Sequence, residues 1–469
     1  GSRIDVSAGA WQPAGRKLGL GAAGQLTLTA GSDLADATLL LGGDIAGFDF
    51  SAGGTLTLGV PQLSIGGTAD TGFSLKPEFF SADGFGTIAV RSVGDVLVAG
   101  GTVLAPQLRN WVLGPGSTQS PSGAMRPGVA AAQFLDESIV DRKPVNLTLA
   151  ATGQIGGTAD IPGASIRVER GAGIVLEDGG KLILQAARDI VVGATGAVSA
   201  QRTTLQALGG EITLRTTGKR GAASQDNAGE DSIGFVPEQA IWLGESATLS
   251  VAGAAELRTQ RASRFAVPTP TFTDGAASAT LTVGNVRGGG TLTLDASRGY
   301  VIAEAGSQML LDGKAADLNF AGLRSGVTVA KSAGTLNVSS PEGFVLDGSI
   351  SALAPVDAQS RRLADGGRLK LELGPGGVST ITLASDRAYP GNADNPRQII
   401  VSEADRILTT GAIPVEYGDD LAAALGNGKG MAPMRLLDRS GFDALTLRAG
   451  DQLLFSGSAG LDKALGIDI

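Results

Sequence analysis

The chain has 469 residues, 72 of them glycine, and contains neither cysteine nor histidine. Without cysteine there are no disulfides and no thiolate metal sites. Without histidine, Ser-His-Asp and Cys-His catalysis and imidazole zinc sites are excluded. The 37 basic and 46 acidic residues give a net charge of −9, which disfavours nucleic acid as a partner. No apolar run approaches the roughly 18 residues of a membrane span, so we expect no membrane insertion.

The same composition favours an elongated, exported protein. Aromatic residues make up only 4% of the chain, which suits a thin core of stacked aliphatic side chains. The glycines follow no triplet period, and the aliphatic content is too high for disorder. Large exported proteins of Gram-negative bacteria often lack cysteine, because a periplasmic disulfide would block passage through an outer-membrane pore. The alternative is a cytosolic protein that needs no cysteine.

One short unit recurs along the chain: Gly-Gly or Ala-Gly, followed by x-Leu-x-Leu. Clear copies occupy residues 23–28, 53–58, 179–184, 209–214, 289–294, 333–338 and 366–371, and looser copies lie at 146–149, 280–283 and 444–447. The alternation predicts a strand with one buried face, with Leu182 and Leu292 inward and Thr291 and Thr293 outward. The preceding glycine is expected to permit a positive φ at a corner.

The spacing of these strands favours a solenoid. Strand-like segments at 166–168, 174–176, 182–184 and 190–192 follow one another at about eight-residue intervals, so three sides return after roughly 20–24 residues. A sandwich or propeller would need hairpins between facing strands, whereas the Asp-Gly pairs here join successive sides of one coil. We therefore predict an all-β fold: a right-handed parallel β-helix (solenoid) with loop insertions, forming an elongated rod of about 15–17 turns.

The interruptions of the repeat define the expected organisation. We predict a β-helix segment over 1–104, an extended insertion over 105–144, β-helix over 145–383 with insertions near 216–237 and 258–276, a loop and short-helix insertion over 384–434, and β-helix continuation over 435–469. The short helix is expected at 419–425, ended by Gly426. The abrupt ends suggest a segment of a longer chain. Recognition is expected in the insertions; tolerated surface decoration is the alternative.

No motif in the chain carries a firm chemical assignment. Residues 19–24 match G-x-G-x-x-G, but a strand rather than a helix is expected to follow, as dinucleotide binding would not allow. Residues 42–49 resemble a calcium-binding nonapeptide out of register, and we interpret them as a turn. The acidic pairs 136–137 and 419–420 would serve glycoside hydrolysis only at a defined separation. We therefore assign no catalytic, cofactor-binding or metal-ligating residue and expect no cofactor; the sequence singles out no binding residue.

Three longer phrases, at 164–184, 298–313 and 440–450, resemble the filamentous haemagglutinin-like large exoproteins of the two-partner secretion pathway, in their interior or C-terminal repeat region. The resemblance implies a non-enzymatic adhesin rod, secreted or held at the surface of a Gram-negative bacterium, with roles in attachment, virulence or biofilm. It also implies an outer-membrane transporter that recognises a region outside this segment. A glycan or protein on host cells or matrix would be the receptor.

Two other functions fit the same fold. The chain could be the stalk of a contact-dependent toxin-delivery exoprotein, in which a lethal domain follows the rod. It could also be a polysaccharide-active β-helix enzyme, since many parallel β-helices cleave polysaccharides.

Overall fold

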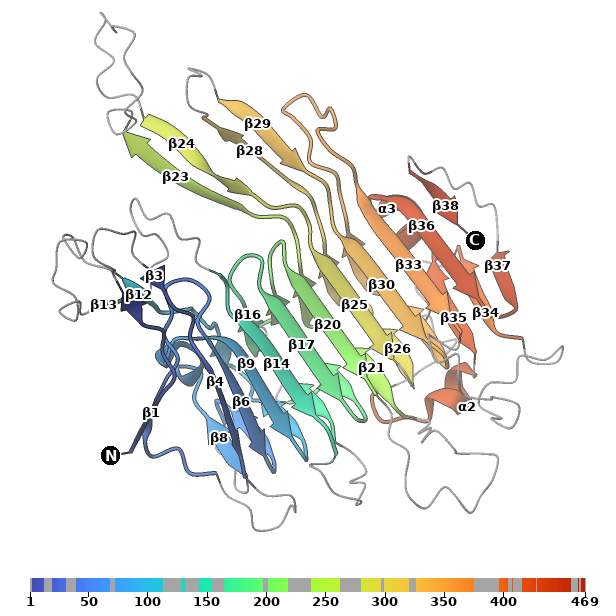
Figure 1. The fold of residues 1–469 in the computed structure, drawn as a ribbon. Coiled ribbons are helices and arrows are strands. Elements are labelled where there is room, and N and C mark those ends of the chain that lie inside the picture. The colour runs from blue at the N-terminus through green and yellow to red at the C-terminus, as the bar shows by residue number, and fades with distance from the viewer. Residues whose placement is uncertain are drawn as a thin grey trace, which may run out of the picture.

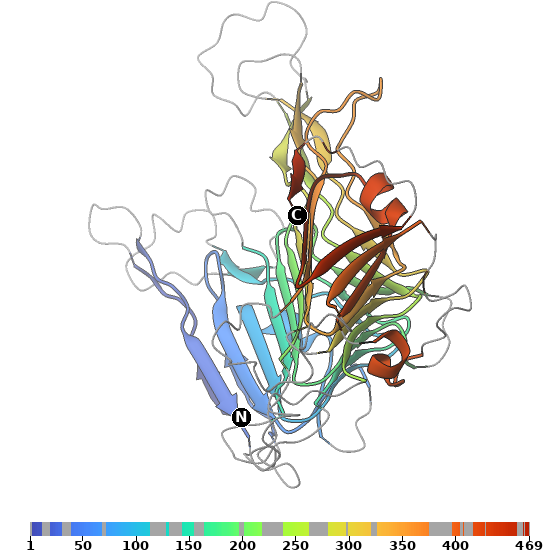
Figure 2. The same ribbon diagram turned by 90° about the vertical axis from the view of Figure 1, so that its right-hand side faces the viewer.

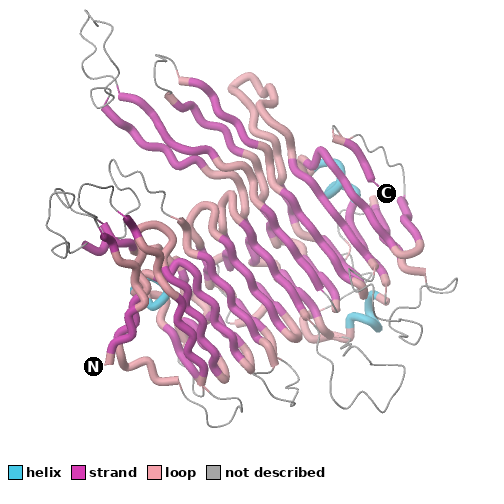
Figure 3. The backbone as a smooth tube through the Cα atoms, viewed as in Figure 1, coloured by secondary structure: helices cyan, strands magenta, loops and turns pink. Residues whose placement is uncertain are grey.

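In the computed structural model, most regular elements of the described residues are short strands joined by loops, and three are short helices (Figure 1, Figure 3). The structure describes residues 2–11, 19–30, 39–67, 72–112, 128–130, 143–153, 164–196, 201–217, 238–261, 280–296, 299–319, 326–374, 396–403, 407, 416–426, 428–456, 463 and 465–468. In Figure 2 the same stack of strands is turned so that its C-terminal end faces the viewer.

The strands form a coil with three faces. The first face has eleven strands in stacking order: β4 (Gln25–Thr29), β6 (Gly54–Val60), β9 (Phe85–Ser92), β14 (Asn146–Ala151), β17 (Lys181–Ala186), β20 (Glu211–Thr216), β25 (Thr291–Ala296), β30 (Thr335–Ser340), β33 (Gly367–Leu373), β36 (Phe442–Ala449) and β38 (Gly466–Asp468).

The second face also has eleven strands, and the third has six. In stacking order the second is β8 (Phe73–Leu75), β7 (Leu63–Ile65), β10 (Val96–Val98), β15 (Ile166–Val168), β18 (Ile190–Val192), β21 (Ala240–Leu243), β26 (Tyr300–Ala303), β31 (Gly343–Leu346), β35 (Lys429–Pro433), β34 (Gln398–Ser402) and β37 (Gln452–Ser456). The third is β11 (Val103–Leu104), β16 (Gly173–Val175), β19 (Thr203–Gln206), β22 (Ala247–Ser250), β27 (Gln308–Leu310) and β32 (Ser349–Ser351).

Every strand on these faces pairs in parallel with its neighbours, and the register aligns the repeat. Leu182 of β17 pairs with Leu147 and Ile212 of the adjacent turns, and Ile212 pairs in turn with Leu292. The aliphatic side chains of the x-Leu-x-Leu unit point into one continuous core, where Leu182 and Leu292 are fully buried. The predicted parallel β-helix is therefore confirmed.

Many turns are longer than the sequence spacing suggested. Ile166 pairs with Ile190, which agrees with the predicted length of one turn. Elsewhere the return is longer: Leu182 pairs with Ile212, and Ile212 pairs with the much more distant Leu292. The expected 15–17 turns are therefore too many for the described part of the chain, because segments that leave the coil consume residues between successive strands.

The second glycine of the repeat is required by close packing of the backbone. A Cβ added to Gly290 would lie 1.9 Å from the carbonyl oxygen of Gly210, and one added to Gly210 would lie 2.1 Å from that of Gly180. Those carbonyls accept hydrogen bonds from the backbone N–H groups of Thr291 (2.9 Å) and Glu211 (3.0 Å). The positive φ that the sequence predicted is taken by the first glycine of a pair, as at Gly179 (φ +80°).

The second face departs from chain order near the C-terminus. After β33 the chain forms β34, then returns to place β35 between β31 and β34. The next segment, α3 (Met434–Arg439), buries Leu436 and Leu437 in the main core before β36 begins. The stretch 384–434, expected as a loop and short-helix insertion, thus also supplies two strands of the coil.

The predicted short helix is present as α2 (Leu421–Leu425), and it covers an apolar outer surface. On the second face, Trp242, Tyr300, Ile302 and Val345 point away from the main core and form a separate buried cluster with Leu421 and Leu425 of α2. Strands β21, β26 and β31 are consequently buried on both sides.

The remaining insertions leave the coil as small antiparallel pairs. Within 105–144, β12 (Asn110–Val112) pairs with β13 (Gly128–Ala130). Around 258–276, β23 (Ala255–Arg261) pairs with β24 (Thr280–Val286), and an unpredicted hairpin joins β28 (Lys314–Leu318) to β29 (Val327–Lys331). The segment 218–237 lies outside the described residues. Near the N-terminus, β1 (Arg3–Asp5) pairs in parallel with β5 (Asp44–Ala46), and β2 (Ala10–Trp11) pairs antiparallel with β3 (Gly19–Leu20).

The core assignment predicts a strong contrast between inward and outward positions. Leu292→Lys buries an unpaired charge and should lower the free energy of unfolding by about 3–5 kcal/mol. Thr293→Ala, on the outer side of the same strand, should change it by less than about 1 kcal/mol. Chemical denaturation measures both values, and equal effects would contradict the inside–outside assignment.

The glycine packing gives a second prediction. Gly290→Ala should lower the free energy of unfolding by about 2 kcal/mol or more, because the methyl group must displace the Gly210 carbonyl and strain the ladder. Gly374→Ala is the matched control, since an added Cβ there meets no atom of the described residues within 4 Å. A Gly290→Ala protein as stable as the control would show that the close approach is not limiting.

Candidate functional site

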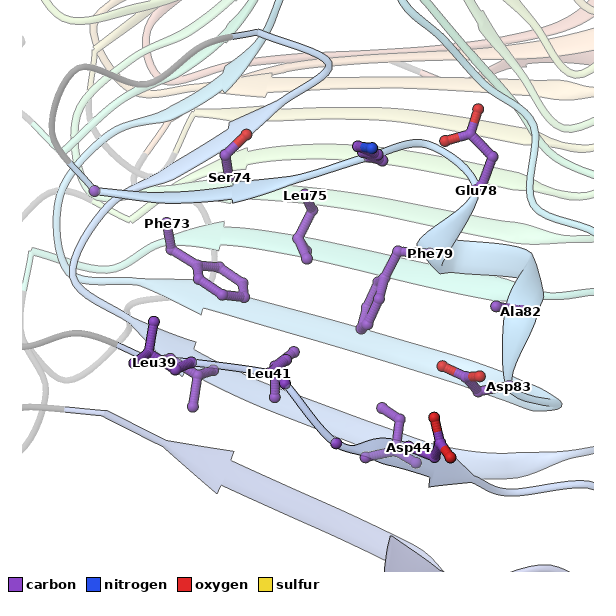
Figure 4. Close-up of a pocket in the computed structure, with 16 residues that line it drawn as sticks. Leu39, Leu41, Asp44, Phe73, Ser74, Leu75, Glu78, Phe79, Ala82 and Asp83 are labelled. Atoms are coloured by element: carbon purple, nitrogen blue, oxygen red, sulfur yellow. The ribbon is translucent and has the colours of Figure 1, made fainter. Parts of the chain in front are cut away.

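The N-terminal end of the coil contains a pocket of about 930 Å³. Leu39 and Leu41 line one wall, while Phe73 and Leu75 of β8 and Phe79 of α1 (Phe79–Ala82) line the opposite wall. In Figure 4 the side chains of the two walls face one another across the opening, and Asp44 and Asp83 lie together at one end. We refer to this pocket as the end groove.

The end groove results from the way the coil begins. Strand β8 follows β7 in the chain and pairs with it in parallel, on the side of β7 that faces away from β10. It is therefore the terminal strand of the second face. The opposite wall runs into β5, which pairs with β1. Apolar side chains that face the interior therefore meet an opening at this end, and Leu40, which also lines the groove, is 87% exposed.

The pKa of Asp83, at the end of the groove, is shifted by its surroundings. Partial burial raises the pKa of Asp83, and the nearby negative charge of Asp44 raises it further, while the more weakly acting Arg109 lowers it. Glu78 and Lys76 also lie on the rim. The groove thus joins an apolar floor to a negatively charged end, a combination suited to a ligand with an apolar body and a cationic group.

In the sequence, Asp44 belongs to the 42–49 segment, whose pattern predicts a turn. In the structure this segment leads into β5, and Asp44 starts that strand. Among the described side chains, no group of three or more acidic residues is placed to hold a metal ion. Sequence reasoning missed the groove because Asp83 and Asp44 are brought together only by the turn of the coil.

The other sequence motifs that lie within the described residues form part of the fold. Residues 19–24 run from β3 into strand β4, with no helix following. Asp420 accepts a hydrogen bond from the N–H of Ala423 (2.8 Å), and Asp419 accepts one from Glu416 (2.8 Å), so this acidic pair orders the start of α2. The pair at 136–137 lies outside the described residues. No helix in the described part of the chain is long and apolar enough to span a membrane.

A second feature projects from the side of the coil. Three consecutive turns send an excursion outward from the corner between the third and first faces: the pair β23–β24, the hairpin β28–β29 and the loop 352–366 (Figure 1). We call these the lateral fin. The excursions are joined at their roots, where Gly253 donates to Asp312 (2.7 Å) and Gly313 donates to Leu353 (2.9 Å) through the backbone. Farther out, Asn319 and Thr282 exchange two hydrogen bonds, of 2.6 and 2.7 Å.

The loop 352–366 is ordered by its own hydrogen bonds. Asp357 accepts from the backbone N–H groups of Gln359 (2.9 Å) and Arg361 (2.8 Å), and Arg361 Nε donates to its other oxygen (2.6 Å). The backbone bond from Arg361 is the main cause that lowers the pKa of Asp357. The loop is fixed to the coil by Arg362, which pairs with Asp443 of β36.

This ordered loop exposes large aliphatic side chains. Leu353 and Val356 are each 52% exposed and Leu363 is 36% exposed. Exposed apolar residues grouped on a rigid loop are typical of interaction sites, because little conformational entropy is lost when such a loop binds.

Comparison with known proteins adds no relative: no family model matches the chain, and neither curated proteins nor solved structures give a significant match.

The raised pKa of Asp83 predicts a pH effect on stability. Between its ordinary pKa of 3.8 and the raised value, the folded chain holds a proton that the unfolded chain has lost, so this group makes stability fall as the pH rises. Asp83→Asn removes the effect. The stability of the variant relative to the parent should therefore increase as the pH rises from 3.8, measured by denaturation across a pH series. A constant difference across the series would contradict this.

Proposed function

We propose that this chain is the rod of a surface-exposed bacterial adhesin, exported by two-partner secretion, which attaches without catalysing a reaction. The adhesin class and the export route in this proposal come from the family resemblance of the repeat. The parallel coil supports it, because a stack of paired turns extends a binding surface away from its point of attachment.

The single observation that carries the proposal is the lateral fin. A coil needs no excursion to remain folded, yet three successive turns each place one at the same corner, and backbone hydrogen bonds join them into one unit. Its loop exposes three aliphatic side chains within eleven residues, Leu353, Val356 and Leu363. We infer that the lateral fin contacts the receptor, a glycan or protein on a host cell or in the matrix.

The remaining parts of the proposal come from the resemblance. The chain is secreted or displayed at the cell surface, and an outer-membrane transporter exports it by way of another region of the protein. In the described acidic pair at 419–420, Asp420 accepts a hydrogen bond from the first turn of α2 and Asp419 accepts one from the preceding Glu416, so the pair is explained by local structure and lends no support to glycan hydrolysis.

The experiment compares adhesion of the purified chain with that of a triple variant, Leu353→Ser, Val356→Ser and Leu363→Ser. Removing the exposed aliphatic contacts should lower binding to a glycan array and to immobilised matrix proteins by about tenfold or more. The thermal midpoint should stay unchanged, since none of the three side chains belongs to the core clusters.

Val103→Ser is the control, because Val103 is also an exposed aliphatic residue (58%) but lies on β11, away from the lateral fin. It should bind as the parent does. Equal binding by the triple variant and the parent would overturn the role of the lateral fin, and cleavage of any glycan by the purified chain would overturn the non-enzymatic assignment.

A further inference from the structure

The terminal strand β8 has an open edge beside the end groove. The Phe73 N–H donates to Gln62 (2.9 Å), and the Leu75 carbonyl accepts from Gly66 (3.1 Å), so residues 73 and 75 bond towards β7. Because alternate residues of a parallel strand bond to opposite sides, the N–H and C=O of Ser74 point away from β7. Among the described residues, no strand lies on that side.

The side chains next to this open edge alternate as a paired strand requires. Phe73 and Leu75 point into the end groove, whereas Ser74 is exposed on the outer side. A further strand stacked on β8 would place every second side chain between Phe73, Leu75 and the facing wall of Leu39 and Leu41 (Figure 4).

The charge of the groove favours a cationic group beyond those apolar side chains. Asp44 and Asp83 lie at the end towards which β8 runs (Figure 4). Burial and the Asp44 charge both penalise ionisation of Asp83 and so raise its pKa, and Arg109 only partly offsets them. A cation at this end would counter the repulsion by Asp44 and favour the ionised form of Asp83, whereas an anionic headgroup such as that of a fatty acid would increase the repulsion.

We propose that the end groove binds an extended peptide, which adds to β8 as a parallel strand. Its alternate aliphatic side chains fill the groove, and a lysine or arginine after them pairs with Asp44 and Asp83. Main-chain hydrogen bonds to Ser74 supply affinity, while the groove and the carboxylates supply specificity. The site lies apart from the lateral fin, so it goes beyond the adhesin proposal and does not depend on it.

The experiment measures binding of three fluorescein-labelled hexapeptides to the full chain by anisotropy. The first, Thr-Val-Thr-Leu-Thr-Lys, matches the predicted pattern. The second ends in Glu in place of Lys, and the third, Lys-Thr-Leu-Thr-Val-Thr, reverses the order with the same composition. We expect the first to bind at least about tenfold more tightly than either of the others.

Two further measurements locate the site. Hydrogen exchange should show new protection of the Ser74 amide when the first peptide is bound. The double variant Asp44→Asn, Asp83→Asn should lose the preference for Lys over Glu, while Asp365→Asn, on the loop 352–366, should retain it. Equal affinities for the three peptides, binding without protection of Ser74, or a preference that survives the double variant would each overturn the proposal.

Discussion

The close stacking of backbone along the glycine corner is the constraint on which the rest of the fold depends. Gly180, Gly210 and Gly290 lie so near one another that a Cβ at either of the last two would overlap the carbonyl below it. That approach lets each carbonyl accept the N–H of the next turn and thereby aligns the strand that follows. Because the side-chain period of a strand is two, this alignment decides that every leucine of the unit faces inward.

A coil whose register is fixed in this way tolerates large departures between its strands. The chain returns to register after a single short turn from Ile166 to Ile190, and after a far longer path from Ile212 to Leu292. It even places β35 between β31 and β34 without breaking the second face. Loop length adds only slowly to the entropic cost of closing a turn, so segments that leave the coil can grow while the core remains unchanged. The lateral fin and the cover formed by α2 are both products of this tolerance.

The two candidate sites differ in how much of each could be read from the repeat. The insertion at 258–276 signalled part of the lateral fin, because the rhythm of the unit stops there. The hairpin β28–β29 was not predicted, because Lys314–Leu318 and Val327–Lys331 contain no proline and no run of polar residues that would mark an insertion. The end groove had no signal at all. Its walls come from separate segments that each resemble ordinary strand or turn.

The sequence by itself determined the parallel coil and the inward leucines, because both depend on a local periodicity that is repeated many times, and the short helix near residue 421, because a helix-forming run there ends at Gly426. Ala240–Leu243 and Tyr300–Ala303 are apolar without alternation, a pattern typical of strands that are buried on both sides, and this pattern indicates the covered outer surface. Only the tertiary structure decided the length of each turn, the reversed order of β34 and β35, the union of three excursions into one fin and the meeting of Asp44 with Asp83. These features depend on contacts between residues far apart in the chain, and the sequence of one repeat does not specify which distant repeat packs beside it.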